Sequence, residues 1–271
     1  MVEAKSTRAF VSGLNADGKQ DYMGGMRSYV SLIVPNRFIF RQVYFGDLPT
    51  FLADGQLRAK NFQPLQACHQ TSYQDIVDRR GSHHFAMPGG RVVNDYVPFY
   101  FSPLTSFTYT IFKRNVPLVS PTGESLGQAC EDDRIFLVAC PANFLASGLP
   151  FCFSNYALNS NAPIPVLETD LSLLEHHVYW DVFDESLDKA QIPEIGYGGV
   201  CRWFHDMASP PNRMTRKAKR MAEFLVQDTV PLTHIECIIA KSDAMRDKLK
   251  SMMDASVWDI PIYVNRGCYF Q

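Results

Sequence analysis

The chain has 271 residues, which is long enough to bury a substantial hydrophobic core. Hydrophobic residues make up 46% and charged residues 20%, and this composition excludes a mostly disordered chain. Because 26 basic residues face 28 acidic ones, the net charge is only −2, and no global basic field points to nucleic-acid binding. Any nucleic-acid site must therefore depend on local clusters.

The seven cysteines are scattered and form no CxxC pair. This pattern indicates free thiols in a reducing compartment rather than a disulfide framework or a zinc site. No run of 18 apolar residues occurs, and the opening MVEAKSTRAF lacks the features of a signal peptide. We therefore expect a cytoplasmic protein with no membrane-spanning helix and no metal.

Residues 1–26 are polar and glycine-punctuated, which is typical of an arm or loosely packed lead-in. The runs 27–34 and 37–43 predict two strands separated by Pro35 and Asn36. A short helix follows at 47–55, with Asp47 as its expected cap and Gly55 as its left-handed end. Residues 61–92 carry no strong period and predict a long loop or a partly helical lid.

Further along, β-type patterns cover 96–102, 107–114, 134–141 and 150–154, with a short helix at 142–148. A possible helix spans 171–183, and a basic helix at 215–222 runs directly into a strand at 223–226. The segments 234–241 and 261–270 and a helix at 242–255 close the chain. Since strands outnumber short helices and no repeat or linker divides the chain, the fold class is α+β in a single domain.

Familiar nucleotide, metalloprotease and hydrolase motifs are absent from the sequence. A first informative cluster lies at 78–103, where Arg79, Arg80 and Arg91 precede an aromatic strand that includes Tyr100. Guanidinium groups beside flat side chains suit a nucleotide, because arginine binds phosphate in a fork. Taken alone, a solvated basic loop beside a core strand explains this cluster better.

A second cluster lies at 216–226, where a basic helix places Glu223 at the start of an apolar strand. A partly desolvated carboxylate at that position acts more strongly on a developing positive charge. From the pattern alone, a surface ion pair between Glu223 and Lys219 or Arg220 is the better interpretation.

Together, the DRRG, NDYVPFYFSP and AEFLV segments resemble the DarT family, bacterial toxins that transfer ADP-ribose from NAD+ to a base in DNA. The resemblance covers residues 37–271 as one catalytic domain and leaves 1–36 as an N-terminal extension. It implies an ADP-ribosyltransferase-like fold, with a central, mostly antiparallel sheet and short peripheral helices.

The resemblance also assigns residues. Glu223 matches the family's catalytic glutamate, and Arg80 matches a loop arginine implicated in binding NAD+ and in proton transfer at the target base. Tyr100 lies on the strand that floors the nicotinamide pocket. Arg41 stands where familiar members have a histidine that contacts the NAD+ ribose, and Arg41, Ser102 and Glu223 are expected to form an Arg/Ser/Glu set like that of other ADP-ribosyltransferases.

DNA recognition is assigned to the irregular stretch 155–214, which precedes the glutamate as the substrate loop does in this superfamily. Aromatic faces there suit stacking with single-stranded bases, and nearby arginines suit phosphates. The expected DNA-binding residues are Tyr156, Tyr197, Trp203, Phe204, Arg213 and Arg216. Alternatively, Trp203 and Phe204 are core residues of a capping segment.

The implied activity is NAD+-dependent ADP-ribosylation of a base in single-stranded DNA, with NAD+ as co-substrate and a cognate antitoxin that removes ADP-ribose. The replaced histidine favours guanine over thymine as the target. Arg80 and Glu223 both remain as acceptors for the proton of the base. The alternatives are transfer to RNA, tRNA or protein, and a non-catalytic NAD+-binding module.

Overall fold

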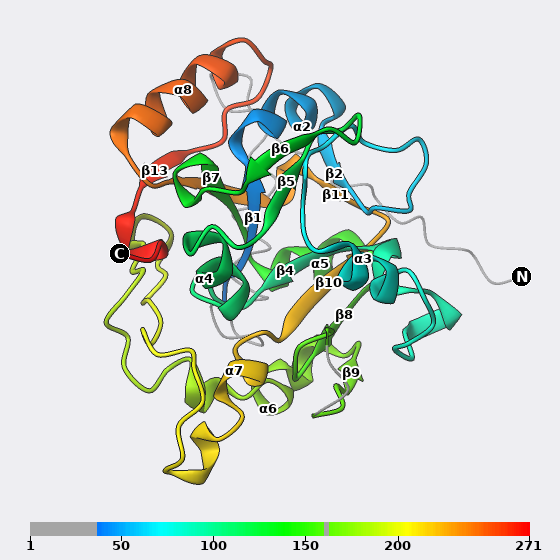
Figure 1. Ribbon diagram of the computed structural model, residues 1–271, viewed down its shortest axis with the longest axis vertical. Helices are drawn as coiled ribbons and strands as arrows, with labels where there is room; N and C mark the ends of the chain where they lie inside the picture. Colours follow the sequence, from blue (N-terminus) through cyan, green and yellow to red (C-terminus); the bar gives the residue numbers. More distant parts are fainter. Residues whose placement is uncertain (1–36, 160–162) are drawn as a thin grey trace, which may run out of the picture.

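The centre of the molecule is an eight-stranded sheet with the order β13-β12-β7-β1-β4-β10-β8-β9. The computed structural model describes residues 37–159 and 163–271, so the predicted strand at 27–34 and the extension 1–36 lie outside the described residues. Figure 1 shows the sheet crossing the molecule with short helices around it. All neighbouring strands of this sheet are antiparallel except β12 and β13, which confirms the predicted α+β class.

The strands of this main sheet are β1 (Ile39–Tyr44), β4 (Tyr96–Tyr100), β7 (Arg134–Ala139), β8 (Phe151–Ser154), β9 (Leu167–Glu168), β10 (Glu223–Gln227), β12 (Ile235–Ala240) and β13 (Ile262–Val264). Two small sheets flank it, formed by β2 (Gln56–Arg58) with β11 (Thr229–Pro231), and by β3 (Gln70–Thr71), β5 (Pro117–Val119) and β6 (Ser125–Gln128). The helices are α2 (Leu48–Asp54), α3 (Gln74–Arg80), α4 (Ser106–Phe112), α5 (Pro141–Ser147), α6 (Leu174–His177), α7 (Arg216–Lys219) and α8 (Asp243–Asp254).

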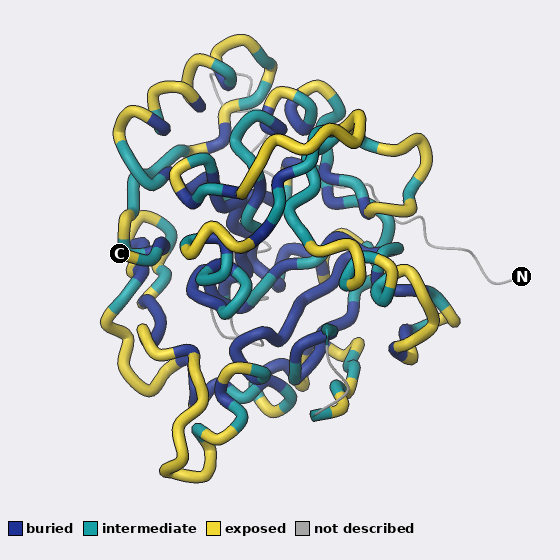
Figure 2. The backbone as a smooth tube through the Cα atoms, in the orientation of Figure 1, coloured by how far each residue is buried: buried dark blue, intermediate teal, exposed yellow. Residues whose placement is uncertain are grey.

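The central strands of the sheet are buried (Figure 2), and most of their buried residues are apolar. Phe224 of β10 is fully buried, and its ring lies 5.1 Å from that of Phe151 and 5.6 Å from that of Phe144. Aromatic pairs at such distances add to the stabilisation from area burial. Since successive strand residues point to opposite faces, burial of Phe224 directs Glu223 to the other face.

Most predicted strands and the helices at 47–55, 142–148 and 242–255 are confirmed with shifts of one to three residues. Gly55 ends α2 in the left-handed conformation as expected. Asp47 precedes α2 but makes no capping hydrogen bond. Its carboxylate instead accepts from the backbone N–H of His69 and lies 2.7 Å from Nδ1 of the same residue.

The prediction of a strand at 107–114 is wrong, because this segment forms the helix α4. Thr105 caps the helix, and its hydroxyl accepts from the backbone N–H of Thr108, whose hydroxyl accepts from the backbone N–H of Thr105 in return. Thr108 and Ile111 are buried at helical spacing. Tertiary burial and the capping box therefore outweigh the β propensity of FTYTIF.

Two predicted helices are shorter than expected. The segment 171–183 is helical only over α6 and two flanking 3-10 turns, because the backbone becomes extended at Val178. The basic helix at 215–222 is the single turn α7. Both changes leave the stretch before Glu223 largely irregular.

We expect Thr105→Ala to lower the free energy of unfolding by about 1 kcal/mol, because the substitution removes the cap of α4. Thr105→Ser keeps the hydroxyl and should stay near the parent value. Urea unfolding followed by circular dichroism measures both variants. Equal stability of the alanine and serine variants would contradict the capping role.

Candidate active site

The predicted catalytic residues meet on three neighbouring strands and one helix. Glu223 is the first residue of β10 and pairs in register with Tyr100, the last residue of β4. Arg41 lies on β1, the other neighbour of β4, and Arg80 is the last residue of α3. The structure therefore brings together four residues that the sequence separates by up to 182 positions.

Arg80 and Glu223 form a bidentate ion pair, in which Nη1 donates to Oε1 and Nη2 to Oε2, both at 2.8 Å. Glu223 is 1% exposed. Burial disfavours the charged form of Arg80, but the Glu223 carboxylate outweighs that effect and raises the pKa of the guanidinium. A fork of this kind fixes the plane and direction of the carboxylate.

A second contact holds Glu223 through its backbone. The N–H of Glu223 donates to Oγ of Ser154 at 3.0 Å, and this hydroxyl donates to the carbonyl of Tyr156 at 2.8 Å. Ser154 is fully buried at the end of β8. Ser154 was not predicted as a site residue. It is the last residue of PFCFS, and only the register between β8 and β10 shows that it lies beside Glu223.

Arg41 is the least satisfied cation near this pair. Its Nη1 donates to the carbonyl of Pro98 at 2.9 Å, whereas its shielded Nε has no partner in the described part of the chain. Burial lowers the pKa of Arg41, and the positive charge of Arg80 acts in the same direction. An unpaired buried donor of a cation is costly, so Arg41 is suited to an anionic ligand such as a diphosphate.

Tyr100 lies between these charges. Burial raises the pKa of its hydroxyl well above the usual value, and the Glu223 carboxylate adds to the increase. The side chain therefore stays neutral, and its ring offers an apolar surface beside Glu223. This placement is compatible with the role expected for it against nicotinamide.

Ser102 does not join Arg41 and Glu223. Its hydroxyl accepts from Nη2 of Arg220 at 2.8 Å and from the backbone N–H of Leu104, and it donates to the carbonyl of Leu104. The structure thus does not support the predicted Arg/Ser/Glu set with Ser102. The serine in contact with Glu223 is Ser154.

Arg220, three residues before Glu223, organises the irregular stretch. It is fully buried, and its Nη1 donates to the carbonyls of Val182, Cys201 and Trp203, while its Nη2 donates to that of Leu104 and to Ser102. Burial lowers its pKa to about 10. From the sequence, Arg220 was expected to be a surface partner of Glu223 or a phosphate contact, because a basic run is usually solvated.

The residues predicted to bind DNA separate into two groups. Trp203 is 50% exposed, and the ring of Tyr156 lies 5.1 Å from that of Tyr179 at a partly exposed position. Phe204 is buried against Tyr109 and Phe270, so its ring offers no free face to a base.

The two predicted phosphate contacts are also engaged within the protein. Arg213 and Arg216 both pair with Glu185, and Arg216 is fully buried. The structure therefore supports an exposed Trp203 and does not support phosphate binding by Arg216.

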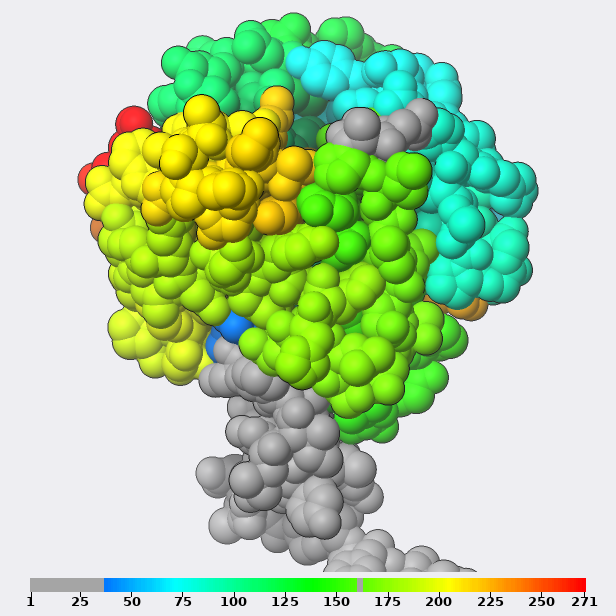
Figure 3. Space-filling view, turned by 90° about the horizontal axis from the view of Figure 1, so that it is seen from below, coloured from blue at the N-terminus to red at the C-terminus, as the bar shows by residue number. Residues whose placement is uncertain are grey.

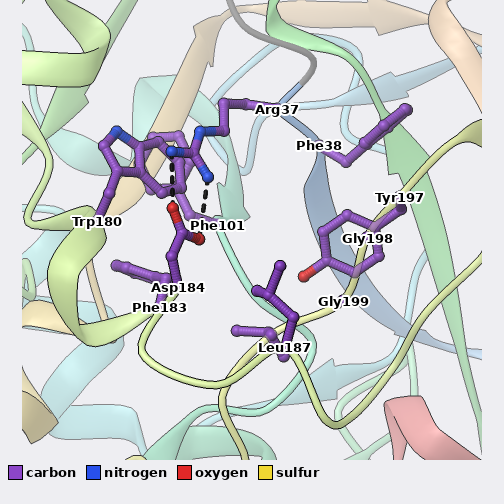
Figure 4. A pocket seen from close by; sticks show the side chains of 11 residues that line it. Arg37, Phe38, Phe101, Trp180, Phe183, Asp184, Leu187, Tyr197, Gly198 and Gly199 are labelled. Carbon is purple, nitrogen blue, oxygen red and sulfur yellow. Dashed lines mark hydrogen bonds and ion pairs between the residues drawn. The ribbon is translucent and has the colours of Figure 1, made fainter.

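A separate cavity of about 180 Å³ lies between the residues before β1 and the irregular stretch (Figure 4). Its wall includes Phe101, whose direction is opposite to that of its neighbour Tyr100. Arg37 pairs there with Asp184 at 2.9 Å. Tyr197 lines this cavity, so the structure places it away from the Arg80–Glu223 pair and does not support its predicted contact with DNA.

No helix within the described ranges is both long and apolar enough to cross a bilayer. Over the same residues, histidine, cysteine and acidic side chains nowhere gather in threes in a way that suits a metal ion.

A mostly antiparallel sheet with a buried Arg–Glu pair at its centre is compatible with an ADP-ribosyltransferase. Residues 40–270 match the family model described as ssDNA thymidine ADP-ribosyltransferase, DarT. The chain therefore belongs to the DarT family of NAD+-dependent DNA ADP-ribosyltransferases.

A relative from Thermus sp. (strain 2.9), described as a DNA ADP-ribosyl transferase, is 26% identical over 216 residues, which cover 79% of this chain and 86% of the relative. The solved structure of Thermus sp. 2.9 DarT in complex with ADP-ribosylated ssDNA matches with a TM-score of 0.66 at 22% identity, covering 87% of this chain and 97% of that one. The complex of the same protein with NAD+ matches with a TM-score of 0.62 at 20% identity, covering 87% and 98%. These likenesses confirm the fold.

We expect Arg80→Met to lower the free energy of unfolding by about 3 kcal/mol or more, because it leaves the Glu223 carboxylate buried without its partner. The double variant Arg80→Met/Glu223→Leu removes both charges and should recover most of that loss. Chemical unfolding of the parent, both single variants and the double variant measures the coupling. Additive effects of the two substitutions would show that the ion pair is not formed.

Proposed function

We propose that the protein transfers ADP-ribose from NAD+ to a base of single-stranded DNA, with guanine preferred over thymine. The observation that carries this proposal is the Arg80–Glu223 pair, which fixes the carboxylate that the resemblance of the AEFLV segment assigns to catalysis. The Thermus relative, solved with NAD+ and with ADP-ribosylated ssDNA, supports both substrates.

In the first step, the bond between ribose C1′ and the nicotinamide nitrogen breaks, and its electron pair leaves with nicotinamide. The ribose becomes oxocarbenium-like, and a carboxylate nearby stabilises that positive charge. Glu223 supplies the carboxylate and accepts a hydrogen bond from the 2′-hydroxyl. Arg80 holds it in a single orientation, so little reorganisation is needed at the moment of reaction.

Arg41 binds the diphosphate of NAD+. Its unpaired Nε and its place beside Arg80 suit the diphosphate, whose negative charge would offset two neighbouring cations. Tyr100 then packs against nicotinamide. In this arrangement Arg41 replaces the ribose-binding histidine of familiar family members.

In the second step, a nitrogen of the base forms the new bond to C1′ and loses its proton. The raised pKa of Arg80 keeps its guanidinium protonated, so it cannot take that proton. We therefore assign proton acceptance to Glu223. Arg80 then acts by positioning the carboxylate and by holding NAD+.

The DNA strand approaches along the stretch before Glu223. Trp203 offers its exposed indole for stacking, while Arg220 fixes the backbone carbonyl of the same residue. A single strand suits this arrangement, because a base inside a duplex hides the atoms that react. The family description names thymidine, and the preference for guanine rests on the change from histidine to Arg41.

One partner and one location follow from this activity. Modified DNA harms its host, so we propose a cognate antitoxin enzyme that removes ADP-ribose from the base. The protein would act where bacterial DNA and NAD+ meet, in the cytoplasm. Transfer to RNA or protein and NAD+ binding without turnover are the competing functions that the next experiment separates.

We expect Glu223→Gln to reduce transfer by about 100-fold or more, because the amide cannot stabilise the oxocarbenium charge. Glutamine preserves the shape of the side chain, so the fold should be retained. The measurement is mass spectrometry of nucleosides from single-stranded oligonucleotides treated with enzyme and NAD+, with RNA and protein pools in parallel. Glu194→Gln, at an exposed position outside the site, serves as the control. Full transfer by a folded Glu223→Gln variant would refute the assignment.

We expect Trp203→Ala to raise the KM for single-stranded DNA about tenfold and to leave the KM for NAD+ nearly unchanged, because stacking contributes roughly 1–3 kcal/mol per base. Val257→Ala removes an exposed apolar side chain elsewhere and is the matched control. If Trp203→Ala weakens use of both substrates equally and lowers the melting temperature, the side chain is structural.

A further inference from the structure

A cavity of about 390 Å³ opens at the edge of the sheet that carries Glu223. Small-molecule sites commonly measure about 300–1,000 Å³, so the space accommodates a nucleobase. Its wall is mostly polar and includes Ser106, Asn159, Asp206 and Lys217. In Figure 3, the yellow segment that contains Asp206 lies beside the green segment that follows β8.

The neighbours of the cavity tie it to the catalytic pair. Met221 lines it two residues before Glu223, and Ser106 lines it where α4 begins, a few residues after β4. Asn159 lines it on the β8 side, and its carbonyl accepts from Nη1 of Arg79 at 2.6 Å. Since Arg79 precedes Arg80 in α3, its contact with Asn159 links the wall of the cavity to the helix that carries Arg80.

Asp206 is an exposed residue of this wall, and one backbone contact orients its carboxylate. Its Oδ1 accepts from the backbone N–H of Lys217 at 2.8 Å, which holds the carboxylate against α7. Within 37–159 and 163–271, no arginine, lysine or histidine forms an ion pair with it. A carboxylate accepts hydrogen bonds at two adjacent oxygens and donates none.

We propose that this cavity receives the target base and that Asp206 selects guanine. Among the four DNA bases, guanine alone presents two adjacent N–H donors, N1–H and N2–H, on its Watson–Crick edge, which is the edge that enzymes read in an extruded base. These donors match the two oxygens of the carboxylate. The ammonium of Lys217 and the hydroxyl of Ser106 supply donors for O6.

The other bases fit this wall poorly. Thymine places its N3–H between two carbonyl oxygens, so a carboxylate that meets the donor also faces an acceptor. Adenine and cytosine each set a ring-nitrogen acceptor beside the amino group. An acceptor held against a carboxylate without a compensating donor is repulsive, and a site built around paired hydrogen bonds rejects such bases strongly.

This inference rests on the proposed function and is tested with Asp206→Asn. The asparagine oxygen can still accept from the N–H of Lys217, while its amide replaces one acceptor by a donor. Loss of a hydrogen bond to a charged group weakens binding about ten- to hundredfold. We therefore expect the ratio of kcat/KM for guanine over thymine to fall by that factor. The substrates are two oligonucleotides that differ at one position.

Asp188→Asn is the matched control, because Asp188 is an exposed carboxylate on the same stretch that pairs with Arg202 and does not line the cavity. It should keep the preference of the parent protein. The affinities of Glu223→Gln and Glu223→Gln/Asp206→Asn for the two oligonucleotides measure the same selectivity without turnover.

Four outcomes would overturn the inference. A parent protein that prefers thymine, or an unchanged preference in Asp206→Asn, would exclude selection of guanine by this carboxylate. A raised KM for NAD+ with unaltered base preference would assign the cavity to NAD+. If the parent protein modifies neither oligonucleotide, the proposed function fails together with the inference, which is a distinct result from altered base choice.

Discussion

The buried pair between Arg80 and Glu223 is the interaction on which the rest of the site depends. A carboxylate that is 1% exposed is costly to ionise unless a cation compensates it, and the bidentate contact from Arg80 provides that compensation. The same contact ties α3 to β10. In the proposed mechanism, stability and chemistry are therefore linked, because the negative charge that the transfer uses is also the charge that the fold must neutralise.

Most strands of the main sheet could be predicted from the sequence, because they are short apolar runs bounded by polar residues. The exception was α4, where the residues of FTYTIF favour a strand and only the capping box with Thr105 and the burial of Ile111 favour a helix. Such tertiary effects leave little trace in a single sequence. Glu223 and Arg80 were found through the resemblance of their segments to a family, and the ion pair that joins them needed the structure.

The rest of the site could not be predicted, because residue type does not report burial. Arg216 and Phe204 have the chemistry expected of a DNA-binding surface, yet both are buried and engaged within the protein. Conversely, Ser154 and Asp206 stand in unremarkable sequence and acquire their contacts only through the register of β8 and the turn of α7. The prediction that Ser102 joins Arg41 and Glu223 failed for the same reason, because the hydroxyl of Ser102 accepts a hydrogen bond from Arg220 instead.

The carbonyl cage around Arg220 has a consequence for how substrate enters. If the stretch that contains Val182 and Trp203 moved away, the buried guanidinium of Arg220 would lose these hydrogen-bond acceptors, which costs free energy. The contact of Arg220 with Leu104 and the start of the strand at Glu223 would be weakened as well. This part of the irregular stretch is therefore expected to be rigid and not to open like a hinged flap. In the proposed reaction, a DNA strand must therefore arrive already unpaired, because this stretch does not open to admit a duplex.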